Sequence, residues 1–345
     1  MKILVVTQAV DIHNTTLGFF HRWIIELSTR FDLVEVVCLY EGEYDLPPHV
    51  HVHSLGKEKG NTRIQYIKNF FCYIWKLRKQ YDVVFVHMNQ EYIVLGGVFW
   101  KLFGKKVFFW RNHPYGNIWT RIAVLFSNQV FCTADQSFTA RYSKTHVMPA
   151  GIDTSVFSID TAHERPKYSL LSFGRIAPVK HIEKSIDATA SLLARGVPVE
   201  LSIVGDWLSR DEQYVENLKK RIAQAHIESS VHFIKGVDFI HAPHTYQSHE
   251  IFLNFTDSGS FDKTVVEALA CGTKVLVSND SMKDLLPYGS YTTGEQDDIV
   301  EKIIALQSFN LAQEEEYRIQ AEKIVQQHSL SRLMDLLYTY IHGNK

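Results

Sequence analysis

The sequence predicts an α/β protein made of two Rossmann-like, doubly wound units in tandem. Short apolar runs alternate with longer amphipathic stretches along the whole chain, which is typical of βαβ units with parallel strands. The 345 residues exceed what one hydrophobic core usually serves. Apolar residues make up 46% and charged residues 21% of the chain, as in ordinary globular proteins.

The first half shows this alternation from its first residues. Residues 2–7 form an apolar run that predicts a buried strand, and the amphipathic stretch 18–30 predicts the helix after it. Further strands are predicted at 33–39, 50–54, 83–87, 106–110, 129–133 and 146–148, and further helices at 62–80, 91–103, 117–126 and 135–142.

A second alternation begins at residue 169, after a polar connector at 154–168 that contains His163, Glu164 and Pro166. The connector is the best candidate for a boundary between two units. Strands are predicted at 169–174, 200–205, 231–235, 251–254, 274–278 and 290–292, and helices at 182–195, 212–225, 263–270, 296–307 and, as a long pair, within 312–341.

Charge and cysteine content exclude several classes of protein. The net charge of −2 gives no overall basic field for nucleic acid, although residues 1–165 carry 18 Lys and Arg against 14 Asp and Glu and the remainder carries 18 against 24. The four cysteines form no Cys-x-x-Cys pair, so we expect free thiols in a reducing cytoplasm. The apolar run at 92–100 is too short to span a bilayer, and the N-terminus lacks the layout of a secretion signal. We therefore expect a cytoplasmic protein.

The loop after the predicted strand 169–174 is a candidate anion site. Gly174 frees the backbone there, and Arg175 and Lys180 lie on the loop that leads into a helix. Two cations beside the amino end of a helix suit a diphosphate. A solvated basic loop is the alternative.

The stretch 257–272 combines a small, flexible loop with the start of a helix. Ser258, Ser260 or Asp262 would cap that helix, and Gly272 would end it. Its free amides could bind phosphate oxygens, and Glu267, one turn into the helix, could accept hydrogen bonds from ribose hydroxyls. The alternative is a buried helix with a structural glutamate.

Three residues of the first half are weaker candidates. Gly18 opens the helix after the first strand, where it would let an anion approach the free amides or would simply form a turn. His87 and His113 each follow a predicted strand. Either could contact a sugar hydroxyl or carry a proton, or be a histidine that only completes local hydrogen bonds.

Two further patterns in the first half leave alternatives open. His49, His51 and His53 alternate with valines, so they could share a metal ion or face water while the valines face the core. Residues 57–79 mix lysines and arginines with aromatic residues. That segment could contact an anionic membrane or a lipid-linked acceptor, or could be an ordinary surface helix.

Four ordered motifs together resemble a known family. Pro149-Ala150-Gly151-Ile152-Asp153 is similar to Pro-Asn-Gly-Ile/Val-Asp, and Val204-Gly205-Asp206 to Val/Ile-Gly-Asp-Gly. Gly174-Arg175 with Lys180 and the stretch 261–272, similar to Phe-Gly-x4-Glu-Ala-x-Ala-x-Gly, complete the set. The chain resembles retaining glycosyltransferases of the GT-B fold, specifically glycosyltransferase family 4 (glycosyl transferases group 1).

The resemblance implies two Rossmann-like lobes facing across a cleft: an acceptor lobe at 1–160, a nucleotide-sugar lobe at 161–328, and a C-terminal helix at 329–345 that crosses back to the first lobe. It implies that Arg175 and Lys180 bind the donor diphosphate, that Glu267 binds ribose and that His113 lies near the transferred sugar. The sequence then predicts transfer from a nucleoside diphosphate sugar to a glycan, lipid-linked or small-molecule acceptor, with no metal and no cofactor. The expected donor-binding residues are Gly18, Arg175, Lys180, Ser260, Phe261, Lys263, Thr264 and Glu267.

The chain departs from the family pattern at the first glutamate of its Glu-x7-Glu pair, which is Gly259 here. Asp257 or Asp262 could partly replace that carboxylate. Trp207 stands where the family often has glycine, and Ala150 replaces asparagine. Two alternatives therefore stay open: a sugar-nucleotide enzyme without transfer, such as an epimerase, and a catalytically weakened sugar-nucleotide-binding protein.

Overall fold

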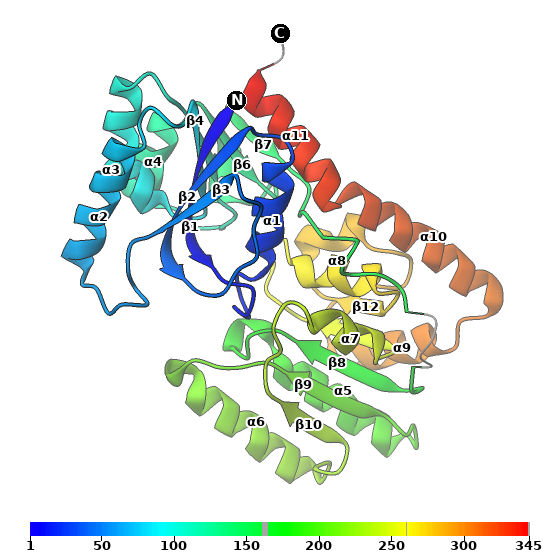
Figure 1. Cartoon of the computed structure of the whole chain (residues 1–345). Helices are drawn as coiled ribbons and strands as arrows, with labels where there is room; N and C mark the ends of the chain where they lie inside the picture. Colours follow the sequence, from blue (N-terminus) through cyan, green and yellow to red (C-terminus); the bar gives the residue numbers. More distant parts are fainter. Residues whose placement is uncertain (161–164, 260, 344–345) are drawn as a thin grey trace. The chain divides into compact units, whose positions relative to one another are not determined.

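The computed structural model describes residues 1–160, 165–259 and 261–343, and the chain divides into two compact units (Figure 1). The first unit comprises Met1–Gly151 together with the C-terminal segment from Leu330, and the second comprises Ile152–Ser329. The boundary between the two units lies between Gly151 and Ile152, before the connector and not at residue 160. Residues that follow Gly151 directly already pack on the second unit. The Ile152 amide donates to the His328 carbonyl oxygen at 2.9 Å, and the ring of Phe157 packs on that of Tyr246.

The first unit contains a parallel sheet of seven strands in the order β3-β2-β1-β4-β5-β6-β7. The central strand β1 pairs with β2 on one side and β4 on the other, so the chain leaves it in opposite directions, as in a doubly wound sheet. The strands are β1 (Lys2–Val10), β2 (Leu33–Glu41), β3 (Val50–Ser54), β4 (Val83–His87), β5 (Lys106–Trp110), β6 (Gln129–Cys132) and β7 (Thr145–Val147).

Helices cover both faces of this sheet. Helices α2, α3 and α4 lie on one face, and α1 and α11 on the other (Figure 1). Side chains of a strand alternate between faces, so Ile3 and Val5 of β1 join the core under α1 and α11, while Leu4 and Val6 join the core under α2–α4. The helices are α1 (Phe19–Ser28), α2 (Arg63–Lys76), α3 (Gln90–Leu102), α4 (Ile118–Phe126) and α11 (Leu330–His342).

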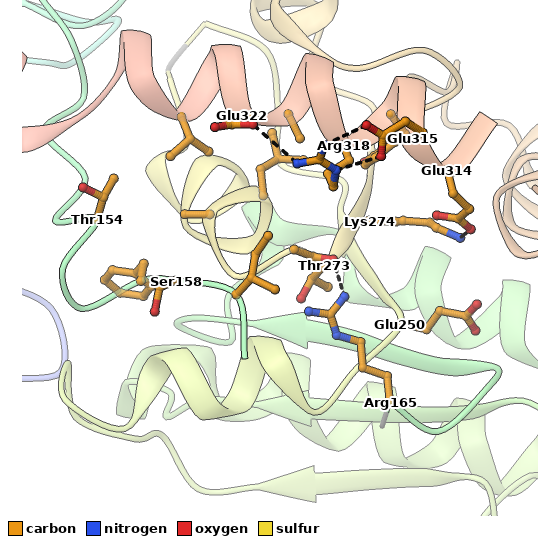
Figure 2. Close-up of a pocket in the computed structure, with 18 of the residues that line it drawn as sticks. Thr154, Ser158, Arg165, Glu250, Thr273, Lys274, Glu314, Glu315, Arg318 and Glu322 are labelled. Atoms are coloured by element: carbon orange, nitrogen blue, oxygen red, sulfur yellow. Dashed lines mark hydrogen bonds and ion pairs between the residues drawn. The ribbon is translucent and has the colours of Figure 1, made fainter. Parts of the chain in front are cut away.

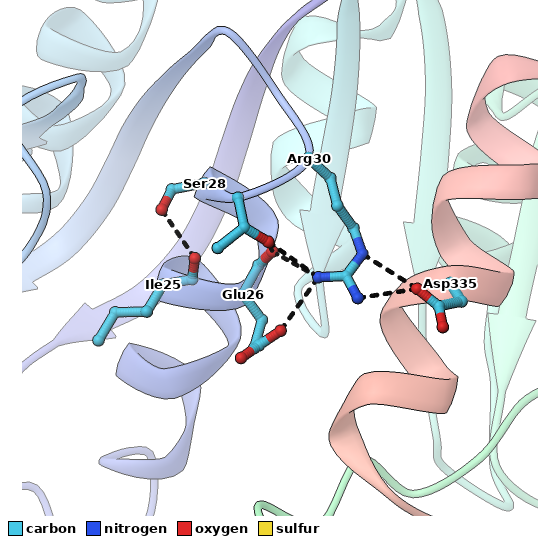
Figure 3. Close-up of polar contacts among 6 residues, drawn as sticks. Ile25, Glu26, Ser28, Arg30 and Asp335 are labelled. Atoms are coloured by element: carbon cyan, nitrogen blue, oxygen red, sulfur yellow. Dashed lines mark hydrogen bonds and ion pairs between the residues drawn. The ribbon is translucent and has the colours of Figure 1, made fainter.

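The last helix of the chain is an integral part of the first unit. Leu333 and Leu337 of α11 are fully buried in the same core as Trp23 of α1. At the edge of this core Arg30 joins the two helices: its guanidinium donates to the Glu26 carboxylate at 3.0 Å and to the Asp335 carboxylate at 2.8 Å (Figure 3). The unit is therefore built from both ends of the chain.

The second unit contains five parallel strands in the order β10-β9-β8-β11-β12, which repeats the pattern of the first unit around its own first strand. The strands are β8 (Ser169–Phe173), β9 (Glu200–Val204), β10 (Val231–Ile234), β11 (Ile251–Asn254) and β12 (Lys274–Val277). The helices are α5 (Ile182–Ala194), α6 (Glu212–Ala225), α7 (Ala242–Gln247), α8 (Lys263–Ala270), α9 (Gln296–Gln307) and α10 (Leu311–Gln327).

Several predicted elements are wrong in detail. The helix expected at 135–142 is only a 3-10 turn at Phe138–Arg141, because the Phe138 amide bonds to the His113 carbonyl oxygen instead of to its own helix. The strand expected at 290–292 is one bridge between Tyr291 and Val277. The helix expected over 62–80 ends at Lys76, and α7 was not predicted. Of the connector, His163 and Glu164 lie outside the described residues.

Two of the three alternating histidines contact a buried carboxylate. His51 Nδ1 lies 3.1 Å and His53 Nε2 2.6 Å from the two carboxylate oxygens of Glu35, which is fully buried on β2. His49 instead contacts the Ser28 carbonyl oxygen. Burial alone would raise the pKa of Glu35, but the hydrogen bonds from the two histidines outweigh it and lower that pKa. Within the described residues no group of three His, Cys, Asp or Glu could hold a metal ion.

In the part of the chain that the structure describes, no helix is long and apolar enough to cross a membrane.

We expect Leu337→Ala to destabilise the first unit by about 2–5 kcal/mol, because it leaves a cavity in the core that α11 completes. Urea unfolding followed by tryptophan fluorescence measures this, since five of the six tryptophans precede residue 151. The exposed Ser331→Ala on the same helix is the control. An equal, small effect of both changes would show that α11 does not stabilise the unit.

The lowered pKa of Glu35 predicts a pH dependence of stability. A carboxyl group with a depressed folded-state pKa stabilises the fold above its unfolded pKa of about 4.5 and loses that contribution as the pH falls. We expect Glu35→Gln to cost about 1–3 kcal/mol at pH 7, and the difference from wild type to shrink below pH 4.5. A difference that stays constant with pH, or that matches the exposed Glu91→Gln, would contradict the prediction.

Candidate functional site

The carboxyl ends of β8, β9 and β11 meet at one edge of the second sheet, where two backbone features bring their loops together. Gly174, at the end of β8, has a φ of +118°. A Cβ at Gly205, after β9, would lie 1.9 Å from the Gly174 carbonyl oxygen, so only glycine fits there. The Ile176 amide donates to the Asp206 carbonyl oxygen at 2.9 Å. The positive φ at Gly174 and the close approach of the two loops at Gly205 explain why glycine occupies both positions.

Asp262 links the loop after β8 to the loop after β11. It caps α8: one carboxylate oxygen accepts from the amide and hydroxyl of Thr264. The other accepts from Asn254 at 2.9 Å, from Thr256 at 3.3 Å and from Lys180 Nζ at 2.6 Å. Burial would raise the pKa of Asp262, but the Lys180 ammonium and these hydrogen bonds hold it well below its usual range. The carboxylate is therefore ionised, and all of its acceptor capacity is used inside the protein.

His181 forms a second link between the same loops. It lies in the left-handed region with a φ of +48°. Its Nε2 is 2.8 Å from an Asp257 oxygen and its Nδ1 is 3.0 Å from Glu183, which also accepts from the Tyr214 hydroxyl at 2.6 Å. Partial burial would lower the pKa of His181, but the two carboxylates raise it above its ordinary value. The loop that follows β8 is thus held at two successive residues, Lys180 and His181.

Glu267 and Lys263 pair along one side of α8. Glu267 is buried; Lys263 Nζ lies 3.4 Å from one of its oxygens, and the Tyr246 hydroxyl donates to the other at 3.1 Å. Burial raises the pKa of Glu267 and lowers the pKa of Lys263. The predicted ribose-binding carboxylate therefore already has two partners inside the unit.

The structure brings most of the predicted residues of the second unit together at the start of α8. Lys180, Lys263, Thr264 and Glu267 belong to the contacts described above, and Phe261 is buried with its ring centroid 4.7 Å from that of His328. Arg175 is exposed on the adjoining loop and has no hydrogen-bond or ion-pair partner among the described residues. Ser260 lies outside the described residues.

The predicted residues of the first unit occupy different surroundings. The amide of Gly18 donates to the Asn14 carbonyl oxygen at 2.9 Å, so this amide is already occupied. His87 is buried and stacks on Phe20 with ring centroids 4.0 Å apart, which fits the structural alternative. His113 is exposed in the loop after β5, where its Nδ1 is 3.0 Å from the Tyr115 amide.

Sequence reasoning missed Tyr246, His181 and Glu183. Tyr246 lies on the unpredicted helix α7, and nothing in its sequence surroundings indicates that it would meet Glu267. His181 directly follows Lys180, so its place on the loop was visible but its contact with Asp257, 76 residues away, was not.

A pocket of about 1100 Å³ in the second unit lies elsewhere (Figure 2). Glu250, which precedes β11, and Lys274, which begins β12, line it, so it opens at the amino ends of the strands. Ligands of parallel α/β sheets bind at the carboxyl ends. Its charges are also paired locally: Arg318 contacts Glu315 at 2.7 Å. This pocket is therefore not the candidate site.

Comparison with known proteins finds a family match in the second unit. Residues 156–307, less than half of the chain, match the family model described as glycosyl transferases group 1. Arg175, Lys180, Asp262 and Glu267 all fall within the matched residues.

One curated relative is the alpha-monoglucosyldiacylglycerol synthase of Streptococcus pneumoniae. It is 29% identical over 163 residues, which are 45% of this chain and 36% of that protein. The match thus spans about a third of the relative's length. Together with the match to the group 1 family model, it supports the prediction of a glycosyltransferase.

Solved structures confirm the predicted fold class. The Anabaena protein HepE, in complex with UDP and glucose, matches with a TM-score of 0.79 at 17% identity over 99% of each chain. Sucrose-phosphate synthase from Thermosynechococcus elongatus matches with a TM-score of 0.76 at 13% identity, again over 99% of each chain. These proteins share with this one a fold of two parallel α/β sheets with flanking helices.

Proposed function

We propose that the protein is a retaining, metal-independent glycosyltransferase that moves a sugar from a nucleoside diphosphate sugar to an acceptor. The observation that carries the proposal is that Arg175 and Lys180 share the loop after β8, where Lys180 contacts Asp262 at the start of α8, within the residues that match the group 1 family model. An exposed guanidinium with no partner among the described residues suits a phosphate, which it can bind through two parallel hydrogen bonds.

The relatives narrow the substrates that we propose. HepE was crystallised with UDP and with UDP-glucose, which favours a UDP-sugar as donor. The name of the curated relative contains diacylglycerol, which favours a lipid acceptor among the glycan, lipid-linked and small-molecule classes.

In the proposed reaction the bond between the anomeric carbon and the phosphate oxygen breaks, and its electron pair stays on the diphosphate. Arg175 and Lys180 stabilise that developing charge, which is how fixed cations lower the barrier of such a step. The acceptor hydroxyl forms the new bond to the anomeric carbon, with retention of configuration. In this proposal His113 of the first unit lies near the transferred sugar.

Asp257, not Asp262, is the better replacement for the carboxylate missing at Gly259. Asp262 is only 11% exposed and its oxygens are saturated, whereas the Asp257 side chain is 65% exposed and only one of its oxygens contacts His181. Gly259 itself has a φ of +109° and donates its amide to Ser281 at 2.8 Å. A glutamate there would adopt a backbone conformation that favours glycine. We therefore propose that Asp257 accepts from the donor sugar.

The absence of a carboxylate at Gly259 favours a second candidate, a sugar-nucleotide-binding protein with weakened catalysis. Incubation with UDP-glucose and a lipid acceptor distinguishes the two: a glucosylated lipid supports the transferase, and tight UDP-glucose binding without glucosylated lipid or glucose release supports the binding protein. Release of an epimerised nucleotide sugar without acceptor would instead support an epimerase.

We predict that Arg175→Ala weakens UDP binding by roughly 1.5–3 kcal/mol, the scale of a hydrogen bond to a charged group. Isothermal titration calorimetry measures this. Arg195→Ala, at the far end of α5, is the matched control because it removes an exposed arginine that contacts Glu301 instead. Equal UDP affinity of Arg175→Ala and wild type would rule out the phosphate contact.

We predict that Asp262→Asn strengthens UDP binding roughly three- to tenfold. The change keeps a helix cap but removes the charge that holds Lys180, so the ammonium becomes available to the phosphates, on a scale of about 1 kcal/mol. Asp187→Asn, which removes a carboxylate paired with Arg221 on α5, should leave the affinity unchanged. Weaker UDP binding by Asp262→Asn would show that Asp262 is needed to position Lys180.

A further inference from the structure

The outer surface of α2, α3 and α4 in the first unit is unusually apolar. These helices cover one face of the sheet with their inner sides (Figure 1). On their outer sides Ile64 of α2 is 80% exposed, Leu102 of α3 76% and Leu125 of α4 67%. A surface helix normally presents polar residues to water, and a helix that is apolar on both sides is typically covered on both sides.

The exposed apolar residues are contiguous from helix to helix. Phe71 of α2 packs on Phe99 of α3 with ring centroids 5.3 Å apart. A Cβ on Gly97 of α3 would lie 2.7 Å from the Phe126 ring, so this glycine lets α4 approach closely. We call the combined surface the outer helical face; its exposed apolar members include Ile64, Trp75, Phe99, Leu102, Trp119 and Leu125.

The same three helices and their connections are rich in cations. Residues 59–134 contain eleven Lys and Arg against two Asp and Glu, in a chain whose net charge is −2. Two cations lie directly over aromatic rings: the guanidinium of Arg78 is 4.2 Å from the Trp75 ring and Lys101 Nζ is 5.2 Å from the Phe126 ring. The exposed cations of the three helices are Arg63, Lys68, Lys76, Lys101 and Arg121.

A pocket of about 650 Å³ adjoins these helices but lies at the carboxyl ends of the strands. Gln8 of β1, Leu55 just after β3 and Asn89 just after β4 line it, together with Arg63 and Trp119. This pocket is therefore not part of the outer helical face, which combines exposed apolar side chains with exposed cations.

We propose that the outer helical face docks on an anionic lipid bilayer. Apolar and aromatic side chains enter the boundary between headgroups and acyl chains, and the lysines and arginines contact the anionic headgroups. The surplus of cations would repel a second copy bound through the same face. Nucleic acid would use the cations but would leave exposed Leu102 and Leu125 in water. The inference does not rest on the proposed function, since it concerns other residues.

The experiment is co-sedimentation of the full chain with vesicles of phosphatidylcholine, with and without phosphatidylglycerol. We expect binding to the anionic vesicles that weakens as salt is added, because headgroup contacts are screened. The charge variant Lys68→Glu/Lys101→Glu/Arg121→Glu and the apolar variant Ile64→Ser/Leu102→Ser/Leu125→Ser should each lower the partition coefficient roughly tenfold or more. All six positions are exposed, so thermal unfolding should stay close to wild type.

The matched control is Leu311→Ser/Lys220→Glu, which makes the same kinds of change at exposed positions of the second unit and should bind vesicles like wild type. Failure of wild type to prefer anionic vesicles would overturn the proposal. Equal binding by the face variants and the control would also overturn it. So would a wild-type dimer that the apolar variant dissociates, or RNA binding without vesicle binding that the charge variant abolishes.

Discussion

The Asp262 carboxylate is the interaction on which the candidate donor site depends. Its oxygens accept hydrogen bonds from Lys180 in the loop after β8 and from Thr264 in the first turn of α8. They also accept from Asn254 and Thr256 at the end of β11. A nearly buried, ionised carboxylate is stable only when such partners compensate the loss of water. Because every partner is also part of the site wall, one group fixes the start of α8 and, as long as no ligand replaces the pair, the place of Lys180.

The same compensation limits what the site residues can do without a ligand. Lys180 is neutralised by Asp262, and Glu267 is held by Lys263 and Tyr246. A donor that recruited Lys180 or Glu267 would have to replace these contacts, so part of its binding energy would go into rearranging the pairs. Arg175 has no such partner in the described chain and is free of this cost. It is therefore the residue best prepared to make the first contact with a diphosphate.

The sequence predicted much of the fold because the relevant signals are local. Strands buried on both faces, such as β4, read as continuous apolar runs, and amphipathic helices such as α6 have a clear 3.6-residue period. Predicted elements failed for two reasons. The helix expected at 135–142 is interrupted because the Phe138 amide donates to the His113 carbonyl oxygen in another loop. Helix α7 was missed because it is short and begins with Ala242-Pro243. In the site, residue types and loops were predictable, but the partners of Glu267 and His181 come from elements far along the chain.

Net charge conceals how the charges are arranged. The value of −2 gives the chain no overall basic field, yet the cations of the first unit concentrate on α2–α4 and their connections. Composition averages over the chain, whereas electrostatic attraction acts within about 10 Å of each charge at ordinary ionic strength. The structure adds what the sequence could not show, namely that these cations share one surface with exposed isoleucine, leucine and tryptophan side chains. A surface of that kind is explained by a partner that offers both anionic groups and hydrocarbon, and a lipid bilayer offers both.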